Sequence, residues 1–345
     1  YVAELKERLT QCRANVIVPL GRTALFALYG FSQMNCPSIS KYRGSILDSS
    51  LLPGRKIIPT FHPSPKNPDP TTRFYGIQDL IRARGDAEFP ELRLPERDLV
   101  TVWQWQDVVA LLGTWPIDQL TAVDIETLND EISHVSLCYR ADRAYVLPFW
   151  TPYRNVWSSG EEAGVWYALG RLLESVPCVG HNIQYDAYML WRKFGIRVNV
   201  AHDTMLAYHI AYSGMAKDLG TLTSLYTREP YYKDDGGDFK LDSENEAAFL
   251  RYSALDAAVL QDILPRVLAD VKRSGNWQVY HDTVRLIEPV LYMQARGIKL
   301  DMGRREAMAT YYRKLEAHIL GHMKKVLAAD LNPNSHQQCM AYFFG

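Results

Sequence analysis

The first hundred positions alternate short strand patterns with helical ones. Apolar spacing predicts a helix over 4–13, a buried strand over 15–20 and, after a glycine, a second helix over 22–30. A further short strand is expected at 56–60. Strand, glycine and helix in that order are typical of α/β structure. Prolines and alternating charges at 85–100 predict a linker.

The central pattern predicts a meander followed by alternating helices and short strands. Three segments have a period of two and are expected as consecutive antiparallel strands: 120–125, 132–139 and 144–149. Helical spacing predicts helices near 104–112, 161–175 and 184–194, with a short apolar run at 176–179 between the last two. From about 202 onward the spacing is helical, with long amphipathic segments at 246–270, 277–296 and 303–328. An α/β domain with a helical extension is therefore expected.

Composition and charge narrow the class of protein. At 345 residues, 47% hydrophobic and 22% charged, the chain is long enough for two or three globular domains. It contains no apolar run of the length that a membrane helix needs, so no membrane partner is expected. The formal net charge of −1 hides an asymmetry: residues 1–75 hold ten Lys and Arg against four acids, a net of +6, which leaves −7 for residues 76–345. The five cysteines form no C-x-x-C pair and fit a reducing compartment.

Two carboxylates close the first strand of the meander. Asp124 and Glu126 lie two residues apart, so a strand directs both side chains to the same face of its sheet. Two adjacent negative charges are electrostatically costly, and a divalent cation between them relieves the repulsion. A solvated strand end explains such a pair equally well, so alone it specifies no site.

Two further acids follow at helical positions. Asp186 falls in the first turn of the helix expected at 184–194, where it would also complement the helix dipole. Tyr252 and Asp256 are four residues apart, which stacks them on one face of a helix. Asp256 lies within an apolar stripe, and its own helix face offers no Lys or Arg as a partner.

Together these motifs resemble the three exonuclease motifs of the proofreading 3′–5′ exonuclease superfamily. The match covers roughly residues 118–272 and is to the four-acid subclass with a tyrosine, in its DNA polymerase I (family A) branch; His202-Asp203-Thr204-Met205-Leu206-Ala207 resembles a helix of that branch. The resemblance implies a ribonuclease H-like fold with a mixed sheet flanked by helices. It implies catalytic roles for the four acids and Tyr252.

The chemistry of the donors agrees with that resemblance. Asp124, Glu126, Asp186 and Asp256 would bind two Mg²⁺ or Mn²⁺ ions roughly 3.5–4 Å apart, an arrangement that clamps attacking and leaving oxygens. Oxygen ligands favour such hard cations over zinc. Tyr252 would orient the nucleophile.

Substrate contacts are expected around this site, each with a plainer alternative. Asn182 is a candidate DNA-end contact or a helix cap, and Leu128 a candidate wedge between terminal bases or a packing residue. Five tyrosines are candidate stacking platforms for bases or packing residues: Tyr185, Tyr188, Tyr226, Tyr231 and Tyr232.

The flanks resemble parts of other domains. Residues 286–301 resemble the opening of a family A polymerase domain, and the N-x-x-S-x-x-Q spacing at 332–338 resembles its thumb region. Upstream, Val16-Ile17-Val18-Pro19-Leu20-Gly21 and the His62-Pro63-Ser64 loop resemble the C-terminal half of a uracil-DNA glycosylase-like domain, which makes His62 a candidate base contact.

The predicted organisation has four parts: a partial glycosylase-like domain (1–84), the linker (85–100), an exonuclease domain (101–275) and the start of a polymerase domain (276–345). The predicted function is a metal-dependent 3′–5′ DNA exonuclease that proofreads for a family A polymerase of phage type. A monomer that acts on single-stranded or frayed 3′ ends with other replication proteins, in the cytoplasm of a bacterial host, is expected. The alternatives are a stand-alone ribonuclease D-like exonuclease, a non-enzymatic DNA-end binding module and uracil recognition.

Overall fold

The computed structural model describes residues 2–30, 38–64, 69–151, 154–234 and 246–345. The chain divides into two compact units at the Ala295–Arg296 bond. The first unit therefore extends beyond residue 275, where the exonuclease domain was expected to end.

The N-terminal part of the first unit has the expected α/β character. Its helices are α1 (Val2–Thr10), α2 (Arg22–Tyr29), α3 (Ile39–Tyr42) and α4 (Pro70–Asp86). Its sheet has the order β1-β3-β2, with β1 (Val16–Ile17) parallel to β3 (Lys56–Ile57) and β2 (Leu47–Asp48) antiparallel to β3. The strands are shorter than the ranges 15–20 and 56–60 predicted, since Pro19 and Pro59 lack the N–H that a ladder requires.

Two elements were not anticipated here. Helix α4 begins where the side chain of Asp69 accepts from the backbone N–H of Thr71, with Pro70 in the first turn. The expected linker at 85–100 begins within α4 and ends in β4 (Asp98–Thr101), which pairs in parallel with β7 (Arg143–Pro148). Only the middle of that range connects the two parts.

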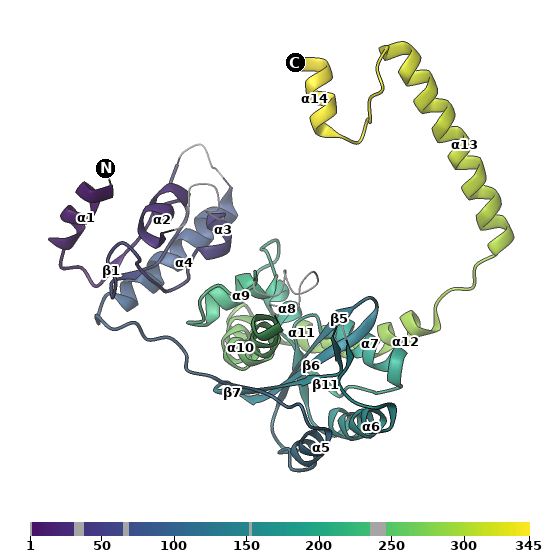
Figure 1. Cartoon of the computed structure of the whole chain (residues 1–345), viewed down its shortest axis with the longest axis horizontal. Coiled ribbons are helices and arrows are strands. Elements are labelled where there is room, and N and C mark those ends of the chain that lie inside the picture. The colour runs from purple at the N-terminus through teal and green to yellow at the C-terminus, as the bar shows by residue number, and fades with distance from the viewer. Residues whose placement is uncertain (1, 31–37, 65–68, 152–153, 235–245) are drawn as a thin grey trace. The chain divides into compact units, whose positions relative to one another are not determined.

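A six-stranded mixed sheet forms the centre of the first unit (Figure 1). Its order is β11-β10-β5-β6-β7-β4, where the strands not yet given are β5 (Thr121–Leu128), β6 (Glu131–Arg140), β10 (Cys178–Gly180) and β11 (Val200–Asp203). Strands β5, β6 and β7 form the predicted antiparallel meander, and β10 and β11 continue the sheet in parallel from β5. A short hairpin, β8 (Trp150–Thr151) and β9 (Arg154–Asn155), follows β7.

Helices cover both faces of this sheet (Figure 1). They are α5 (Trp105–Gly113), α6 (Ser159–Ser175), α7 (Ile183–Phe194), α8 (Thr204–Ala211), α9 (Leu219–Tyr226), α10 (Glu246–Arg273), α11 (Trp277–Arg285) and α12 (Ile287–Arg296). The expected helix at 277–296 is interrupted at Leu286, after which α12 starts anew with Pro289 in its first turn. Proline is tolerated there because its missing N–H would have no partner within the helix.

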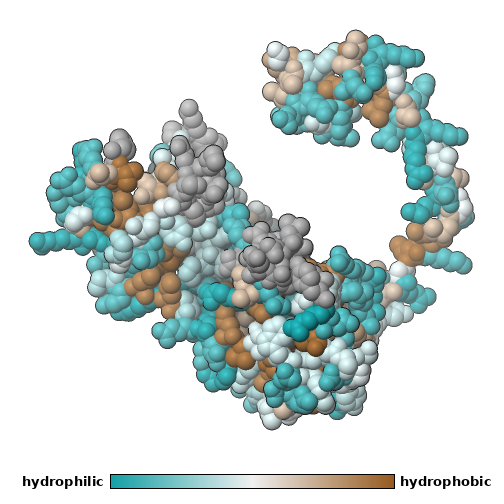
Figure 2. Space-filling model, viewed as in Figure 1, coloured by the Kyte–Doolittle hydropathy of each residue, from teal (hydrophilic) through white to brown (hydrophobic). Residues whose placement is uncertain are grey.

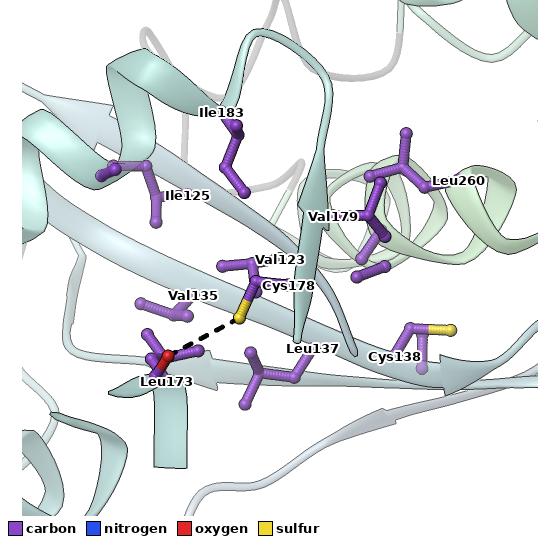
Figure 3. Packing of buried hydrophobic residues seen from close by; sticks show 14 of the residues in the cluster. Val123, Ile125, Val135, Leu137, Cys138, Leu173, Cys178, Val179, Ile183 and Leu260 are labelled. Atoms are coloured by element: carbon purple, nitrogen blue, oxygen red, sulfur yellow. Dashed lines mark hydrogen bonds between the residues drawn. The ribbon is translucent and has the colours of Figure 1, made fainter. Parts of the chain in front are cut away.

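The alternation of β5 separates the core from the chemistry. Val123 and Ile125 are buried on the face that packs against Leu173 of α6, and Figure 3 shows Val135 and Leu137 of β6 beside them. On the opposite face, Val179 lies next to Leu260 of α10 (Figure 3). Asp124 and Glu126 alternate with the core residues of β5, so their side chains face α10.

The second unit consists of two helices with no buried residue, α13 (Met302–Leu327) and α14 (His336–Phe344). Apolar side chains lie at its surface (Figure 2), with Ile298 89% and Phe344 80% exposed. Among the helices that the structure describes, none combines the length and the apolar composition needed to cross a membrane.

Candidate active site

Three carboxylates from β5 and α10 converge on one point. Asp124 and Glu126 come from β5 and Asp256 from the middle of α10, and one oxygen of each lies within 4.8 Å of the others. As predicted, Asp124 and Glu126 point to the same face of the sheet, and α10, which packs on that face, adds Asp256.

The oxygens of this cluster suit a cation. Asp124 Oδ2 is buried and has no hydrogen-bond partner in the part of the chain that the structure describes. Burial, and then the charges of Asp256 and Glu126, raise the pKa of Asp124 well above its usual range. An orphaned, buried carboxylate oxygen among other acids is the environment that a hard divalent cation would satisfy.

Asp186 lies beside the cluster but is not one of the three converging acids. It belongs to the first turn of α7, as predicted, and its Oδ1 accepts from the backbone N–H of Ile125 at 2.9 Å. Burial is the main cause that raises the pKa of Asp186 to about 8. Its bond to the backbone between Asp124 and Glu126 makes it the fourth acid of the site.

The start of α7 is built by tight packing and a shared cap. A Cβ on Gly180 would lie 2.8 Å from the Cβ of Ile183, so only glycine fits where β10 turns into the helix. Asn182 has φ +61° at the N-cap. The carboxylate of Asp203 then accepts from the N–H of Asn182 and Ile183, and also caps α8 through Leu206. Asp203 thus fixes the helix that presents Asp186.

Tyr252 joins the cluster together with two residues that the sequence did not single out as its partners. Tyr232 donates its hydroxyl to Asp256 Oδ1 at 2.7 Å, and Lys233 Nζ lies 2.5 Å from Asp256 Oδ2. Lys233 also donates to the Tyr252 hydroxyl at 3.1 Å. Tyr232 is therefore a buried partner of Asp256, not a stacking platform. No periodicity marks this loop, so neither contact could have been read from the chain.

Of the three candidate substrate residues, Leu128 is buried, whereas His62 and Asn182 are exposed. Leu128 is 7% exposed and packs against Phe249, as the packing alternative for this residue predicted. His62 is exposed and lies next to Gly21 in the N-terminal part, where its role as a base contact stays a prediction. Asn182 is exposed at the start of α7 and makes no cap with its side chain, which leaves its amide available.

The other candidate tyrosines divide between surface and core. Tyr185 is 45% exposed next to Asp186 and its hydroxyl contacts Thr127 at 2.9 Å, so it remains a candidate platform. Tyr226 is buried and donates to Asp270. Tyr231 packs its ring against Tyr42. Tyr188 is half-buried against the core.

A comparison with protein families finds one whose members resemble the part of the chain that contains this site. Residues 119–271 match the family model described as 3′-5′ exonuclease, in the DNA polymerase A exonuclease family. The comparison with curated proteins found no relative. The match spans all four acids and Tyr252.

Three solved structures illustrate the likeness of the fold. The catalytic core of RRP6 from Trypanosoma brucei is 16% identical, with a TM-score of 0.45 over 57% of this chain and 53% of that one. RNase D from Escherichia coli is 15% identical, with a TM-score of 0.45 over 58% and 51%. The POL domain of Pol1 from M. smegmatis is 16% identical, with a TM-score of 0.48 over 71% and 40%. The chain spans about half the length of the first two.

The family model and the sheet topology confirm the predicted fold class. The mixed sheet flanked by helices is that of ribonuclease H-like 3′–5′ exonucleases, and exonuclease domains of this family use divalent metal ions. Residues 119–271 are thus similar to the 3′–5′ exonuclease domain of the DNA polymerase A family.

Proposed function

We propose that this protein is a metal-dependent 3′–5′ DNA exonuclease that proofreads for a family A DNA polymerase. The observation that carries the proposal is the cluster of Asp124, Glu126 and Asp256, in which a buried Asp124 oxygen has no partner among the described residues. A buried acid without a partner is costly unless a cation or a proton satisfies it.

The chain's own groups have distinct roles in this reaction. Asp124, Glu126, Asp256 and the adjacent Asp186 would hold divalent cations, Mg²⁺ or Mn²⁺, which when bound activate the attacking water and neutralise charge on the leaving oxygen. Burial and the neighbouring acids raise the pKa of Tyr252 far above its usual range. Tyr252 therefore stays protonated at neutral pH and orients the nucleophile as a hydrogen-bonding group, not as a base.

The substrate end would approach over the exposed start of α7. Asn182 and Tyr185 are both exposed there, four residues and one residue before Asp186. An amide and an aromatic ring suit a terminal nucleotide, because bases stack on aromatic side chains in a sequence-tolerant way. These two residues are the proposed contacts to the 3′ end.

The polymerase parent rests on the flanks of the nuclease. Residues 286–301 and 332–338 resemble the start of a family A polymerase domain, and the net charge of +6 in residues 1–75 favours phosphate. The parent polymerase, the phage type and the glycosylase-like ancestry of residues 1–84 are parts of the proposal. The chemistry proposed for the carboxylate cluster does not depend on these three assignments.

The test of the proposal is hydrolysis of a labelled oligonucleotide from its 3′ end. Wild type with Mg²⁺ or Mn²⁺ should release nucleoside monophosphates, and Asp124→Ala or Asp186→Ala should abolish release while both variants remain folded. Hydrolysis that persists unchanged in either variant contradicts the proposal. Matched DNA and RNA strands separate the proofreading enzyme from a ribonuclease D-like one, because only the former should prefer DNA.

A further inference from the structure

Lys233 places a positive charge inside the carboxylate cluster. Its Nζ is 2.5 Å from Asp256 Oδ2 and 3.1 Å from the Tyr252 hydroxyl, and it lies 4.5 Å from the centre of the Tyr252 ring. The other oxygen of Asp256 accepts from Tyr232. Both oxygens of this metal-binding acid are therefore engaged, one of them by a cation.

The loop that carries Lys233 is held in place by ion pairs of the residues before it. Preceding Lys233, Arg228 makes a two-bond pair with Asp86 of α4 at 2.7 and 2.9 Å. Glu229 is 5% exposed and pairs with Arg97 at 2.9 Å. The Arg228–Asp86 pair has two bonds and is partly buried, and the Arg97–Glu229 pair is buried, so both hold the loop more firmly than exposed pairs would.

The N-terminal part completes the anchor. Lys41 of α3 pairs with Asp234, the residue after Lys233, at 2.7 Å, and the ring of Tyr42 lies 5.0 Å from that of Tyr231. Residues on both sides of Lys233 thus contact elements outside the nuclease domain. These contacts before and after Lys233 restrict the backbone that presents its side chain.

We propose that Lys233 is a further active-site residue of the nuclease, an internal cation that holds Asp256 and Tyr252 in the metal-free protein and competes with the divalent cation for Asp256. The inference rests on the proposed function, because it assumes that the cluster binds metal. A monovalent and a divalent cation repel each other, so both cannot occupy one face of a single carboxylate without a free-energy cost. Metal binding therefore releases the Lys233–Asp256 pair.

A positioning consequence follows for Tyr252. Lys233 is a donor only, so in the metal-free protein the Tyr252 oxygen accepts from it and keeps its own proton for another partner. Release of Lys233 frees that oxygen at the moment when the site becomes loaded. Lys233 would then be available to substrate phosphate, as a compact cation on a flexible stem.

The decisive measurement is Mn²⁺ binding by calorimetry to wild type and Lys233→Met, which keeps the length of the side chain and removes its charge. The variant should bind Mn²⁺ about 5- to 10-fold more tightly, within the usual range of coupling between two sites. Lys233→Arg should stay close to wild type. Unchanged or weaker Mn²⁺ binding by Lys233→Met would overturn the inference.

Lys272→Met is the matched control. It removes a lysine charge sixteen residues after Asp256 in α10, which is about 24 Å away at 1.5 Å per residue. Its Mn²⁺ affinity should not change. A second measurement needs no variant: acetylation of each lysine in wild type, followed by mass spectrometry. Mn²⁺ should increase the labelling of Lys233 and leave that of Lys272 unchanged, whereas equal or reduced labelling of Lys233 contradicts the competition.

The two proposals fail in different ways. Wild type that binds Mn²⁺ but releases no nucleotides from a 3′ end refutes the proposed function and leaves the competition at Lys233 to be decided by calorimetry. Wild type that hydrolyses 3′ ends, together with a Lys233→Met variant of unchanged Mn²⁺ affinity, refutes the role of Lys233 alone.

Discussion

At the scale of single residues, burial in the absence of a cation raises the pKa of Asp124 and Asp186. Asp186 is 6% exposed and its pKa is raised to about 8, although its Oδ1 accepts a backbone bond that favours the charged form. Desolvation outweighs that bond. The metal-free site therefore holds protons that a divalent cation must displace, and metal binding should strengthen with rising pH.

The Asp186→Asn variant tests this balance. An acid with a raised pKa in the fold stabilises it fully only below the usual carboxyl pKa of about 4, and this contribution is lost as pH rises toward 8. Asn resembles the protonated acid and can still accept from Ile125. Metal-free Asp186→Asn should thus be more stable than wild type at pH 8, by at least about 1.4 kcal/mol, the equivalent of one pKa unit, as measured by urea unfolding.

The same variant should lose function. Its 3′-end hydrolysis is expected to fall more than about 100-fold, beyond the loss typical for partners of metal ligands. The stability difference between variant and wild type should be smaller at pH 5 than at pH 8, and this pH dependence is the internal control. A variant less stable than wild type at pH 8 would show that Asp186 is ionised and well satisfied without metal.

Sequence reasoning succeeded at this scale where local geometry decides the outcome. The period of a strand puts Asp124 and Glu126 on one face, and helix spacing stacks Tyr252 over Asp256. Lys233 escaped prediction because it lies in a loop without periodicity and its partner, Asp256, lies across the fold on α10. Leu128 was ambiguous for the same reason, since only the packing of Phe249 decides whether it is buried.

At the scale of elements, Asp203 connects two helices that the site depends on. Its carboxylate caps the first turns of both α7 and α8 and is 1% exposed. One acid therefore satisfies the N-terminal N–H groups of two helices. The segment 202–207 was expected to be a helix, and α8 confirms this from Thr204 onward. The role of Asp203 in holding α7 depends on β11, a strand that the sequence did not reveal.

Asp203→Ala should consequently destabilise the protein by about 2 kcal/mol, twice the typical cost of about 1 kcal/mol for a lost cap. Asp218→Ala is the matched control, because Asp218 is exposed and caps α9 alone. Urea unfolding of both variants measures the difference. A loss for Asp203→Ala no greater than that for Asp218→Ala would refute the shared cap.

Periodicity identified most of the long elements but missed the edge strand β4 and the helix α4. The meander β5–β7 and helices α6, α7 and α10 carry clear periods and were predicted. Strand β4 was hidden in a proline-containing range, and it is held by its pairing with β7, a contact distant in sequence. Helix α4 was not predicted either. An edge strand such as β4 depends on its pairing partner, which the local pattern of the sequence does not identify.

At the scale of the whole molecule, the chain divides at the Ala295–Arg296 bond, at the end of α12. Helices α11 and α12 contribute four buried side chains to the main core: Tyr280, Val284, Ile287 and Leu291. The polymerase-like resemblance at 286–301 thus begins inside the first unit. The amphipathic pattern at 277–296 predicted a buried face but not which core would bury it.

Truncations test this boundary. A chain of residues 1–295 should keep the thermal midpoint and Mn²⁺ affinity of the full chain, because no residue of α13 or α14 is buried. A chain of residues 1–275 should lose several kcal/mol of stability, since each large apolar side chain contributes about 1.5–3 kcal/mol when buried. Equal stability of the two truncated chains in calorimetry would show that α11 and α12 are dispensable.

The central claim is that the carboxylate cluster hydrolyses nucleic acid from its 3′ end. Its most direct measurement is release of nucleoside monophosphates from a 3′-labelled DNA strand by wild type and Asp124→Ala, each with Mn²⁺ and with EDTA. The account predicts release by wild type with Mn²⁺ alone, and none by folded Asp124→Ala in either condition. Release that continues in EDTA, or in Asp124→Ala, would contradict it.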